Sequence, residues 1–425
     1  MAAFVPYAGG SAATIVVPLS ISVTTAPTKV NYTAGEALNV NGMVVVANMS
    51  DGSTQDVTSA VTVTPSAGTA LYESNTAIQI SWTDPEFGNT FTTTQAISVT
   101  RVLSSIAVTS APTKTEYNDG EALDMTGIAV TATYTSGATA TVTGSVTFSP
   151  ANGSTLSGVG TKNITVSYTE NGVTKTATTS VTVKVKIVTF ASGTDAELSA
   201  MLDAAYDGSI TLSDYWKVGD ERQVTLSAMA ATGVGESHVS QTVTFVILNV
   251  GGKTLANGQT CKFIVGLKNF LSNGATGEWG YMNSTNTNSG GWKNSARRTW
   301  CNNTFYNSLP SGFKALFKDF VNKSGTGGGS SSGTEDTTDK FALAAEVEVF
   351  GTTTYSVAGE GSQFDYYKTA ANRVKKAGNS GSANTWWERS PYSGNTYYFC
   401  LVRSAGYADY NGANYGGGIA PFGCL

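Results

Sequence analysis

Cysteine is absent from the first 260 residues, and the four cysteines of the chain, Cys261, Cys301, Cys400 and Cys424, form no CxxC pair. A small secreted scaffold held by disulfides would use more cysteine. We therefore interpret all four as small buried hydrophobic side chains. The chain also has a single histidine, His238. Without further nitrogen and sulfur ligands a zinc site is not expected, and we predict no bound metal.

Charge is scarce as well, because Asp, Glu, Lys and Arg together make up 13% of the chain. The net charge is −5 and the isoelectric point is about 5.1. No basic stripe can therefore displace counterions from a phosphate backbone, which argues against nucleic acid as a partner. No apolar run approaches the ~18 residues of a membrane helix, and the first residues lack the basic and apolar regions of a signal peptide. We expect no membrane insertion.

The chain also lacks the common catalytic motifs. The chain contains no GxSxG, HExxH, Walker or dinucleotide-binding glycine motif, and no nucleophile motif lies near His238. We interpret His238 as a surface histidine. The sequence therefore predicts no enzymatic activity, no catalytic residue and no cofactor.

What the chain does contain is an internal repeat, which indicates tandem domains. The segment Ile21–Lys29 recurs as Ile106–Lys114, and Gly35-Glu-Ala-Leu38 recurs as Gly120-Glu-Ala-Leu123. Each pair is 85 residues apart, and 14 of the 26 positions from Ile21 to Val46 match their counterparts. The two segments should therefore fold alike.

Both copies have the pattern of a β-sandwich. Apolar residues alternate with polar ones in 128–134 and in 162–168, which is the pattern of half-buried strands. Asn171-Gly172 between two such runs predicts a type I′ hairpin turn. With about seven short strands expected in each ~85-residue copy, the copies resemble bacterial immunoglobulin-like (Ig-like) domains. The resemblance is carried by the Pro-Thr-Lys…Tyr…Gly-Glu-Ala-Leu run and by the closing strand at Val181–Val183.

The pattern changes after Val185. Thr194-Asp-Ala-Glu197 is a capping box, and the apolar spacing that follows predicts a helix to about Tyr206. We predict further helices at about 296–306 and 312–321. The Gly/Ser/Thr-rich segment 324–339 is interpreted as a mobile, solvated loop. Short strands and aromatic loops make up the rest, so this region should be a mixed α+β domain.

From Trp216 onward the sequence resembles C-type-lectin-like domains that are common in phage and gut-bacterial proteins. The matching segments include Met282–Ser295, Gly359-Glu-Gly361, Trp386–Pro391 and Gly418–Cys424. The resemblance implies a multidomain fold class, with two all-β Ig-like sandwiches followed by an α+β C-type-lectin-like domain. The expected divisions are an N-terminal attachment arm (1–19), Ig-like domains (20–102 and 103–185) and the C-terminal domain (186–425), which opens with a short helical lead-in (186–215).

Within this domain, we expect Trp386, Trp387 and Phe422 to be core anchors. Arg389 is expected to form a structural ion pair, with Glu388 or Glu360 as its partner. The same fold class includes formylglycine-generating enzymes, but no matching motif surrounds Cys400 and Cys424. The Glu-Pro-Asn and Trp-Asn-Asp motifs of calcium-dependent sugar binding are also absent.

The segment 395–418 has an unusual composition. It contains five tyrosines among Asn, Ser and Gly, which is the composition of antibody binding loops. It also lacks Lys, Glu, Gln, Met and Trp, the five residue types that codons ending in a pyrimidine cannot encode. The alternative interpretation is an ordinary tyrosine- and glycine-rich region with structural roles.

The same segment resembles the variable region of proteins diversified by retroelements. This implies scaffold positions at Phe399, Cys400, Val402, Ser404, Gly406 and Ala408. The exposed, ligand-binding positions would be Asn395, Thr396, Tyr397, Tyr398, Leu401, Arg403, Tyr407, Asp409, Tyr410, Asn411, Asn414 and Tyr415.

These features together lead us to expect a phage virion surface protein. It would bind a host-surface or mucosal protein or glycan through the tyrosine-rich segment, and other virion proteins through its N-terminal region. A homo-oligomer is expected from the resemblance. The alternatives are a bacterial surface adhesin and a structural decoration protein of a capsid or tail that binds no ligand.

Overall fold

The computed structural model describes residues 15–234, 237–271, 280–329, 333–379 and 381–425. The chain divides into two compact units, Met1–Lys184 and Val185–Leu425. Most of the expected attachment arm (1–19) lies outside the described residues, and its last two residues, Pro18 and Leu19, already belong to the first strand. No described helix is long and apolar enough to cross a membrane.

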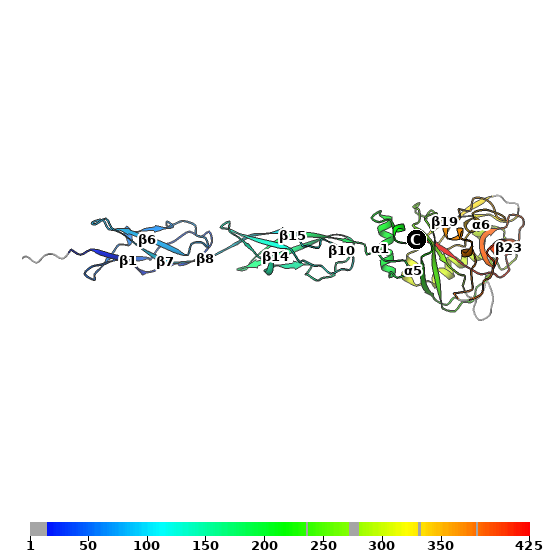
Figure 1. Cartoon of the computed structure of the whole chain (residues 1–425), viewed down its shortest axis with the longest axis horizontal. Coiled ribbons are helices and arrows are strands. Elements are labelled where there is room, and N and C mark those ends of the chain that lie inside the picture. The colour runs from blue at the N-terminus through cyan, green and yellow to red at the C-terminus, as the bar shows by residue number, and fades with distance from the viewer. Residues whose placement is uncertain (1–14, 235–236, 272–279, 330–332, 380) are drawn as a thin grey trace, which may run out of the picture. The chain divides into compact units, whose positions relative to one another are not determined.

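The first unit contains the two repeat copies, and the strands of each copy lie in separate sheets (Figure 1). The first copy has strands β1 (Pro18–Thr25), β2 (Asn31–Thr33), β3 (Val44–Met49), β4 (Thr54–Asp56), β5 (Thr62–Thr64), β6 (Ala77–Thr83), β7 (Thr90–Ala96) and β8 (Ser98–Thr100). The second has β9 (Leu103–Ser110), β10 (Glu116–Asn118), β11 (Ala129–Tyr134), β12 (Thr139–Thr141), β13 (Thr147–Ser149), β14 (Gly160–Glu170) and β15 (Val173–Lys184). The first five strands of the second copy each begin 85 residues after their counterparts, so the sequence repeat is a structural repeat.

The repeated tyrosine explains much of the shared motif. Tyr32 is buried, and its hydroxyl lies 2.9 Å from the carbonyl oxygen of Lys29 and 3.0 Å from that of Asn39. Tyr117 makes the equivalent contacts in the second copy. In each copy the repeated lysine also pairs with the repeated glutamate, as Lys29 does with Glu36. The motif therefore ties one loop to the buried core of each copy.

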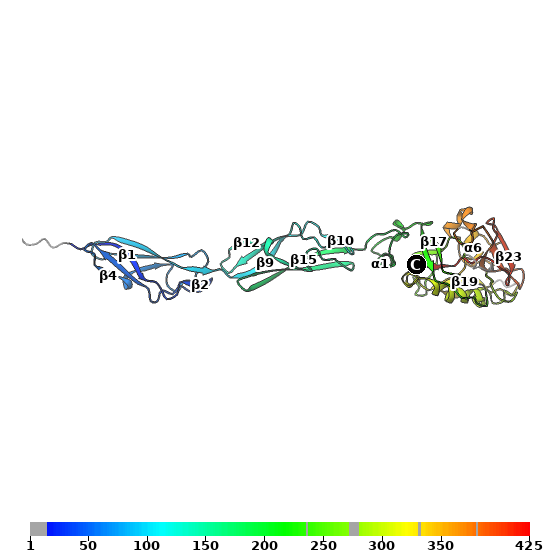
Figure 2. The same cartoon turned by 90° about the horizontal axis from the view of Figure 1, so that it is seen from below.

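Each copy has an apolar core of its own, and Figure 2 shows the strands of both copies from a second side. In the second copy Ile164, Val166 and Val183 are fully buried between the sheets β9–β11–β12 and β10–β15–β14–β13. The predicted hairpin is confirmed, because Asn171 and Gly172 have φ angles of 48° and 79° between the paired strands β14 and β15.

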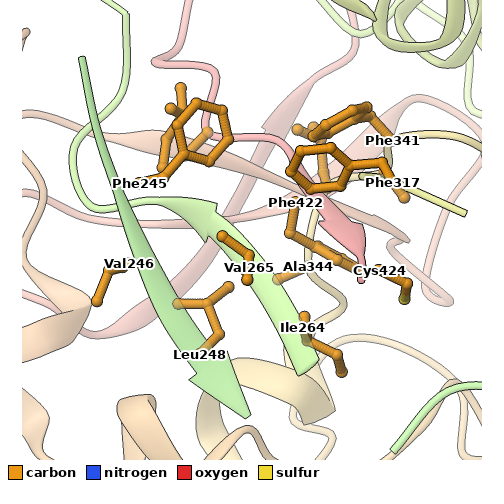
Figure 3. Packing of buried hydrophobic residues seen from close by; sticks show 14 of the residues in the cluster. Phe245, Val246, Leu248, Ile264, Val265, Phe317, Phe341, Ala344, Phe422 and Cys424 are labelled. Atoms are coloured by element: carbon orange, nitrogen blue, oxygen red, sulfur yellow. The ribbon is translucent and has the colours of Figure 1, made fainter. Parts of the chain in front are cut away.

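The second unit is built on a four-stranded sheet in the order β16–β17–β18–β24. Its strands are β16 (Glu221–Leu226), β17 (Gln241–Val250), β18 (Phe263–Leu267) and β24 (Phe422–Cys424). Figure 3 shows Phe317 and Phe341 beside Phe422 of β24, with Val265 on the neighbouring strand β18. The Phe317 and Phe341 rings are 4.6 Å apart, which places a dense aromatic cluster against this sheet.

Helices and two smaller sheets surround this core. They are α1 (Asp195–Tyr206), η3 (Leu212–Asp214), α2 (Gly291–Asn294), α3 (Ala296–Trp300), the π-helix η4 (Cys301–Phe305), α4 (Tyr306–Ser308), α5 (Ser311–Ala315), β19 (Phe320–Gly325), β20 (Thr334–Asp339), α6 (Glu346–Phe350), α7 (Asp365–Lys368), η5 (Ala370–Arg373), β21 (Trp386–Pro391), β22 (Tyr398–Val402) and β23 (Ala408–Gly412). The capping box at Thr194 and the helix after it are confirmed, as is helical structure from residue 296. The helix predicted for 312–321 ends at Ala315, because Phe320 and Val321 pair with β20 instead.

The segment 324–339, which we interpreted as a mobile loop, is largely a hairpin arm. Its residues 334–339 form β20 and pair in antiparallel register with β19. The strand is held by buried polar contacts instead of an apolar face. Asp339 is 1% exposed and accepts hydrogen bonds from the Trp292 indole (2.8 Å) and from Arg298 (2.6 Å). Residues 330–332 lie outside the described part of the chain.

Candidate ligand-binding face

The tyrosine-rich segment forms two strands of the three-stranded sheet β21–β22–β23. Strands β22 and β23 pair from Tyr398↔Gly412 to Val402↔Ala408, and β23 is the edge strand. The central strand β22 is covered on both faces, so Phe399, Cys400 and Val402 are fully buried, as expected of scaffold positions.

Two of the sequence-based assignments in this segment are wrong. Leu401 was expected to be exposed, but it is 0% exposed because both faces of β22 are covered. Ser404 was expected to be scaffold, but it lies exposed in the turn between β22 and β23. The other eleven predicted binding positions are exposed or half-buried. Gly406 and Ala408 are half-buried.

The exposed positions form what we call the tyrosine-rich face, made of residues 395–398, Arg403, Tyr407, 409–411 and 414–415. Tyr397, Tyr407 and Tyr415 are its most prominent members, with 53%, 58% and 60% of each residue exposed. Arg403 and Asp409 form an ion pair with each other. The face therefore offers large amphipathic rings together with one neutralised charge pair.

Two half-buried tyrosines of this face, Tyr398 and Tyr410, pack with two further half-buried tyrosines, Tyr355 and Tyr392. The rings of Tyr392 and Tyr410 are parallel and 4.3 Å apart, and Tyr398 stacks on Tyr410 at 5.3 Å. Tyr355 meets Tyr410 edge to face at 4.9 Å. Burial raises the pKa of Tyr355, and the neighbouring Asp409 raises it further. Tyr355 and Tyr392 were not predicted from the sequence, because both lie outside the tyrosine-rich segment 395–418.

Asn288 holds the loop that leads into β22. Its side-chain nitrogen lies 3.2, 2.9 and 2.8 Å from the carbonyl oxygens of Tyr392, Asn395 and Tyr398. Its side-chain oxygen accepts a hydrogen bond from the Gly328 amide. Because Asn288 is itself fully buried, the loop is fixed from inside the protein.

Side chains also cover the free edge of β23. The amide of Tyr410 donates to Asp409 Oδ1 (2.9 Å), and the amide of Gly412 donates to Asn411 Oδ1 (2.8 Å). Both amides point away from β22. The Arg403 amide donates to the carbonyl oxygen of Tyr407, and in an antiparallel pair the hydrogen-bonded positions recur at every second residue. Residues 410 and 412 fall between these positions, so their amides face the free edge. Capping unpaired donors in this way discourages the addition of another strand.

Glycines allow the end of the segment to pass the core anchors. A Cβ atom at Gly417 would lie 2.7 Å from Trp387 Nε1, and one at Gly418 would lie 2.4 Å from the Phe270 ring. Trp386 and Trp387 are fully buried and Phe422 nearly so, so the three predicted anchors are confirmed.

Beneath the sheet lies a buried ionic network. Arg389 forms its ion pair with Glu348, not with the side chain of Glu388 or Glu360 as expected, and it reaches Glu360 through a backbone carbonyl oxygen (2.6 Å). Glu348 also pairs with Lys253. Burial works against ionisation of Glu348, but these two cations hold the pKa of its carboxyl below the usual value. The network is thus a charged structural support.

Glu388 differs from its neighbours in this network. It is fully buried, and neither of its carboxyl oxygens has a hydrogen-bond partner among the described residues. Burial, together with the nearby Glu346 and Glu360, raises the pKa of Glu388 well above its ordinary value of 4.5. The folded protein therefore holds the Glu388 proton to a higher pH than the unfolded chain does.

The remaining titratable candidates from the sequence lie in the core. His238 is 3% exposed and lies 6.2 Å from the Trp300 ring, so our expectation of a surface histidine is wrong. All four cysteines are buried and free, which confirms their interpretation as core residues. Among the described residues, no group of three or more His, Cys, Asp and Glu side chains could hold a metal ion.

Comparison with known proteins supports one part of this organisation. Residues 110–183 match the family of bacterial Ig-like domains (group 3), so the second repeat copy is an Ig-like domain in a multidomain, mostly β chain. Residues 268–425, which contain the tyrosine-rich face, match a domain of unknown function, DUF6273. No curated protein matches the chain.

Proposed function

We propose that this protein is a non-enzymatic binding protein whose tyrosine-rich face contacts a protein or glycan on a host or mucosal surface. The observation that carries the proposal is the clustering of eleven of the twelve predicted positions at the surface of one sheet edge and its loops. Tyrosine rings provide contact area with few rotatable bonds, and the surrounding Asn and Gly provide adaptable hydrogen bonds.

The rigid support of the face favours the same role. The face stands on strand β22, four of whose five residues are buried, and its loop is held by a buried asparagine. Binding residues on a rigid scaffold lose little conformational entropy when a ligand is bound. Side-chain variation at the exposed positions would also leave these buried contacts intact. This supports, as part of the proposal, a C-type-lectin-like domain diversified by a retroelement.

We further propose that the protein acts on the surface of a phage virion, as a homo-oligomer joined to other virion proteins through its N-terminal region. Tandem Ig-like domains suit a spacer between a particle and a binding domain. Many copies on one particle would turn weak single contacts into strong attachment, because each further contact becomes intramolecular.

The test is retention of the purified full chain on immobilised mucin and on intact gut bacteria. The variant combines Tyr397→Ser, Tyr407→Ser and Tyr415→Ser, and Tyr215→Ser is the matched control because Tyr215 is also exposed (44%) and lies outside the face. We expect at least a tenfold loss of retention for the triple variant and none for the control. Equal retention of the triple variant and the wild type would favour a decoration protein without a ligand.

A further inference from the structure

A groove with a mixed polar and apolar lining belongs to none of the sites described above. It has a volume of about 300 Å³ and runs along the helical residues 296–304. Thr299, Trp300, Asn303 and Thr304 form its helical wall, and Thr232 and Ser284 lie across from them.

Six of the nine lining residues have uncharged hydrogen-bonding side chains, and Gly233, Val234 and Ala296 complete the lining. The side chains of Thr299, Asn303, Thr304 and Ser284 form no hydrogen bond with another residue in the described part of the chain. Trp300 is 3% exposed and stacks on Phe305 at 5.8 Å, so the base of the groove is apolar and well packed. Free hydroxyl and amide groups above an apolar base are suited to a ligand that is itself neutral and rich in hydroxyls.

The helix beneath the groove departs from regular α-helical geometry. Residues 301–305 form a π-helix, which includes the groove residues Asn303 and Thr304. Such turns are rare and occur frequently at functional sites. This backbone feature is independent of the side chains that line the groove.

One segment connects the groove with the tyrosine-rich segment. Ser284 lines the groove, and two residues further on, Asn286 Oδ1 accepts a hydrogen bond from the Ala413 amide (3.0 Å). The Met282 amide donates to the carbonyl oxygen of Ala413 (2.9 Å). A ligand in the groove is therefore close to the loop that follows β23.

We propose that this groove binds one or two neutral sugar rings of the surface glycan that the tyrosine-rich face approaches, an inference that rests on the proposed function. None of the lining residues is charged. The neighbouring Arg297, 4.8 Å from the Trp300 ring, is buried and bonded to the carbonyl oxygens of Tyr281 and Val234, which leaves it poorly placed for a charged ligand. A purely apolar ligand would leave the hydroxyl groups without partners. The volume lies at the small end of the roughly 300–1,000 Å³ found for small-molecule sites, which suits a sugar unit better than a peptide.

The test uses the full chain and a panel of neutral mono- and disaccharides, titrated at millimolar concentration and followed by the indole N–H signals in nuclear magnetic resonance spectra. Variants are Asn303→Ala and Thr299→Val on the helical wall and Ser284→Ala opposite. Asn307→Ala is the matched control, since Asn307 is exposed on the same helical stretch but does not line the groove. Thermal melting of each variant checks that it is folded.

We expect at least one sugar to shift the Trp300 signal, and each wall variant to weaken its binding about tenfold while Asn307→Ala does not. No response to any sugar, or unchanged binding in folded Asn303→Ala and Ser284→Ala, would overturn the inference. The two proposals fail separately. If retention depends on the three tyrosines but no sugar binds, only the groove proposal is rejected. If a sugar binds but the triple tyrosine variant is retained in full, only the proposed role of the face is rejected.

Discussion

The rings of Tyr392 and Tyr410 lie face to face, with centroids 4.3 Å apart and planes inclined by 4°. Tyr392 directly follows β21 and Tyr410 lies in β23, so the stack joins the two outer strands of the sheet across β22. Tyr398 of the middle strand packs on the same ring. These contacts brace the sheet edge that carries the tyrosine-rich face.

Replacing Tyr410 with alanine should destabilise the second unit. Aromatic pairs contribute about 0.5–1.5 kcal/mol beyond the area that they bury, so we expect a loss of roughly 1–2 kcal/mol in the free energy of unfolding. Tyr407→Ala is the control, because Tyr407 is 58% exposed and makes no such stack. Urea unfolding followed by tryptophan fluorescence measures the difference, since six of the seven tryptophans lie in the second unit. Equal effects of the two variants would contradict this prediction.

Glu348→Gln should be among the most destabilising single substitutions. It removes the anion that two buried cations, Arg389 and Lys253, share. Removing one partner from a buried pair typically costs about 3–5 kcal/mol, because a charge is left without compensation. Glu221→Gln breaks the exposed pair with Lys268 and should change the free energy of unfolding by only ~0–1 kcal/mol. The same urea experiment compares them, and similar losses would count against the structural role of the network.

Glu388→Gln should make stability less dependent on pH. Folded Glu388 keeps its proton above 4.5, the pH at which the unfolded side chain loses it. The stability that this residue contributes is therefore complete below 4.5 and declines as the pH rises toward the folded pKa. Glutamine cannot lose a proton, so the variant should gain on the wild type by up to ~1.4 kcal/mol per pH unit as the pH rises from 4.5 toward the folded pKa of Glu388. Unfolding curves measured across that range test this slope. A difference in the free energy of unfolding between variant and wild type that does not change with pH would contradict the raised pKa of Glu388.

Asn288→Ala should loosen the loop before β22 more than it affects the core. The substitution leaves the carbonyl oxygens of Tyr392, Asn395 and Tyr398 without their shared donor. We expect hydrogen exchange to accelerate at least tenfold in 392–398 and to remain unchanged in β17. Asn294→Ala, at an exposed helical position, is the matched control. Unchanged exchange in 392–398 would show that the loop is held by other contacts.

The sequence was most informative where structure depends on neighbouring residues. The turn at Asn171-Gly172 and the capping box at Thr194 are local patterns with one favoured geometry, and both are present. The 85-residue repeat likewise reproduces the order of the strands. Such features require no knowledge of distant contacts.

Long-range packing decided the features that sequence reasoning missed. Leu401 is buried because other parts of the chain cover both faces of β22, which its neighbours in sequence do not reveal. Tyr355 reaches the tyrosine cluster from 55 residues before Tyr410. Strand β20 lacks an apolar face and is held by polar contacts such as that between Asp339 and Trp292. Single-sequence patterns carry no signal for contacts of this kind.

Strand β24 affects the order in which the protein can fold. Ile264 of β18 pairs with Cys424 across some 160 residues, whereas each Ig-like copy pairs its strands within its own ~85 residues. On the ribosome, the two copies can fold as they emerge, but the second unit must wait for its last strand. A stop codon or frameshift in the tyrosine-rich segment removes that strand and leaves β18 with an open edge.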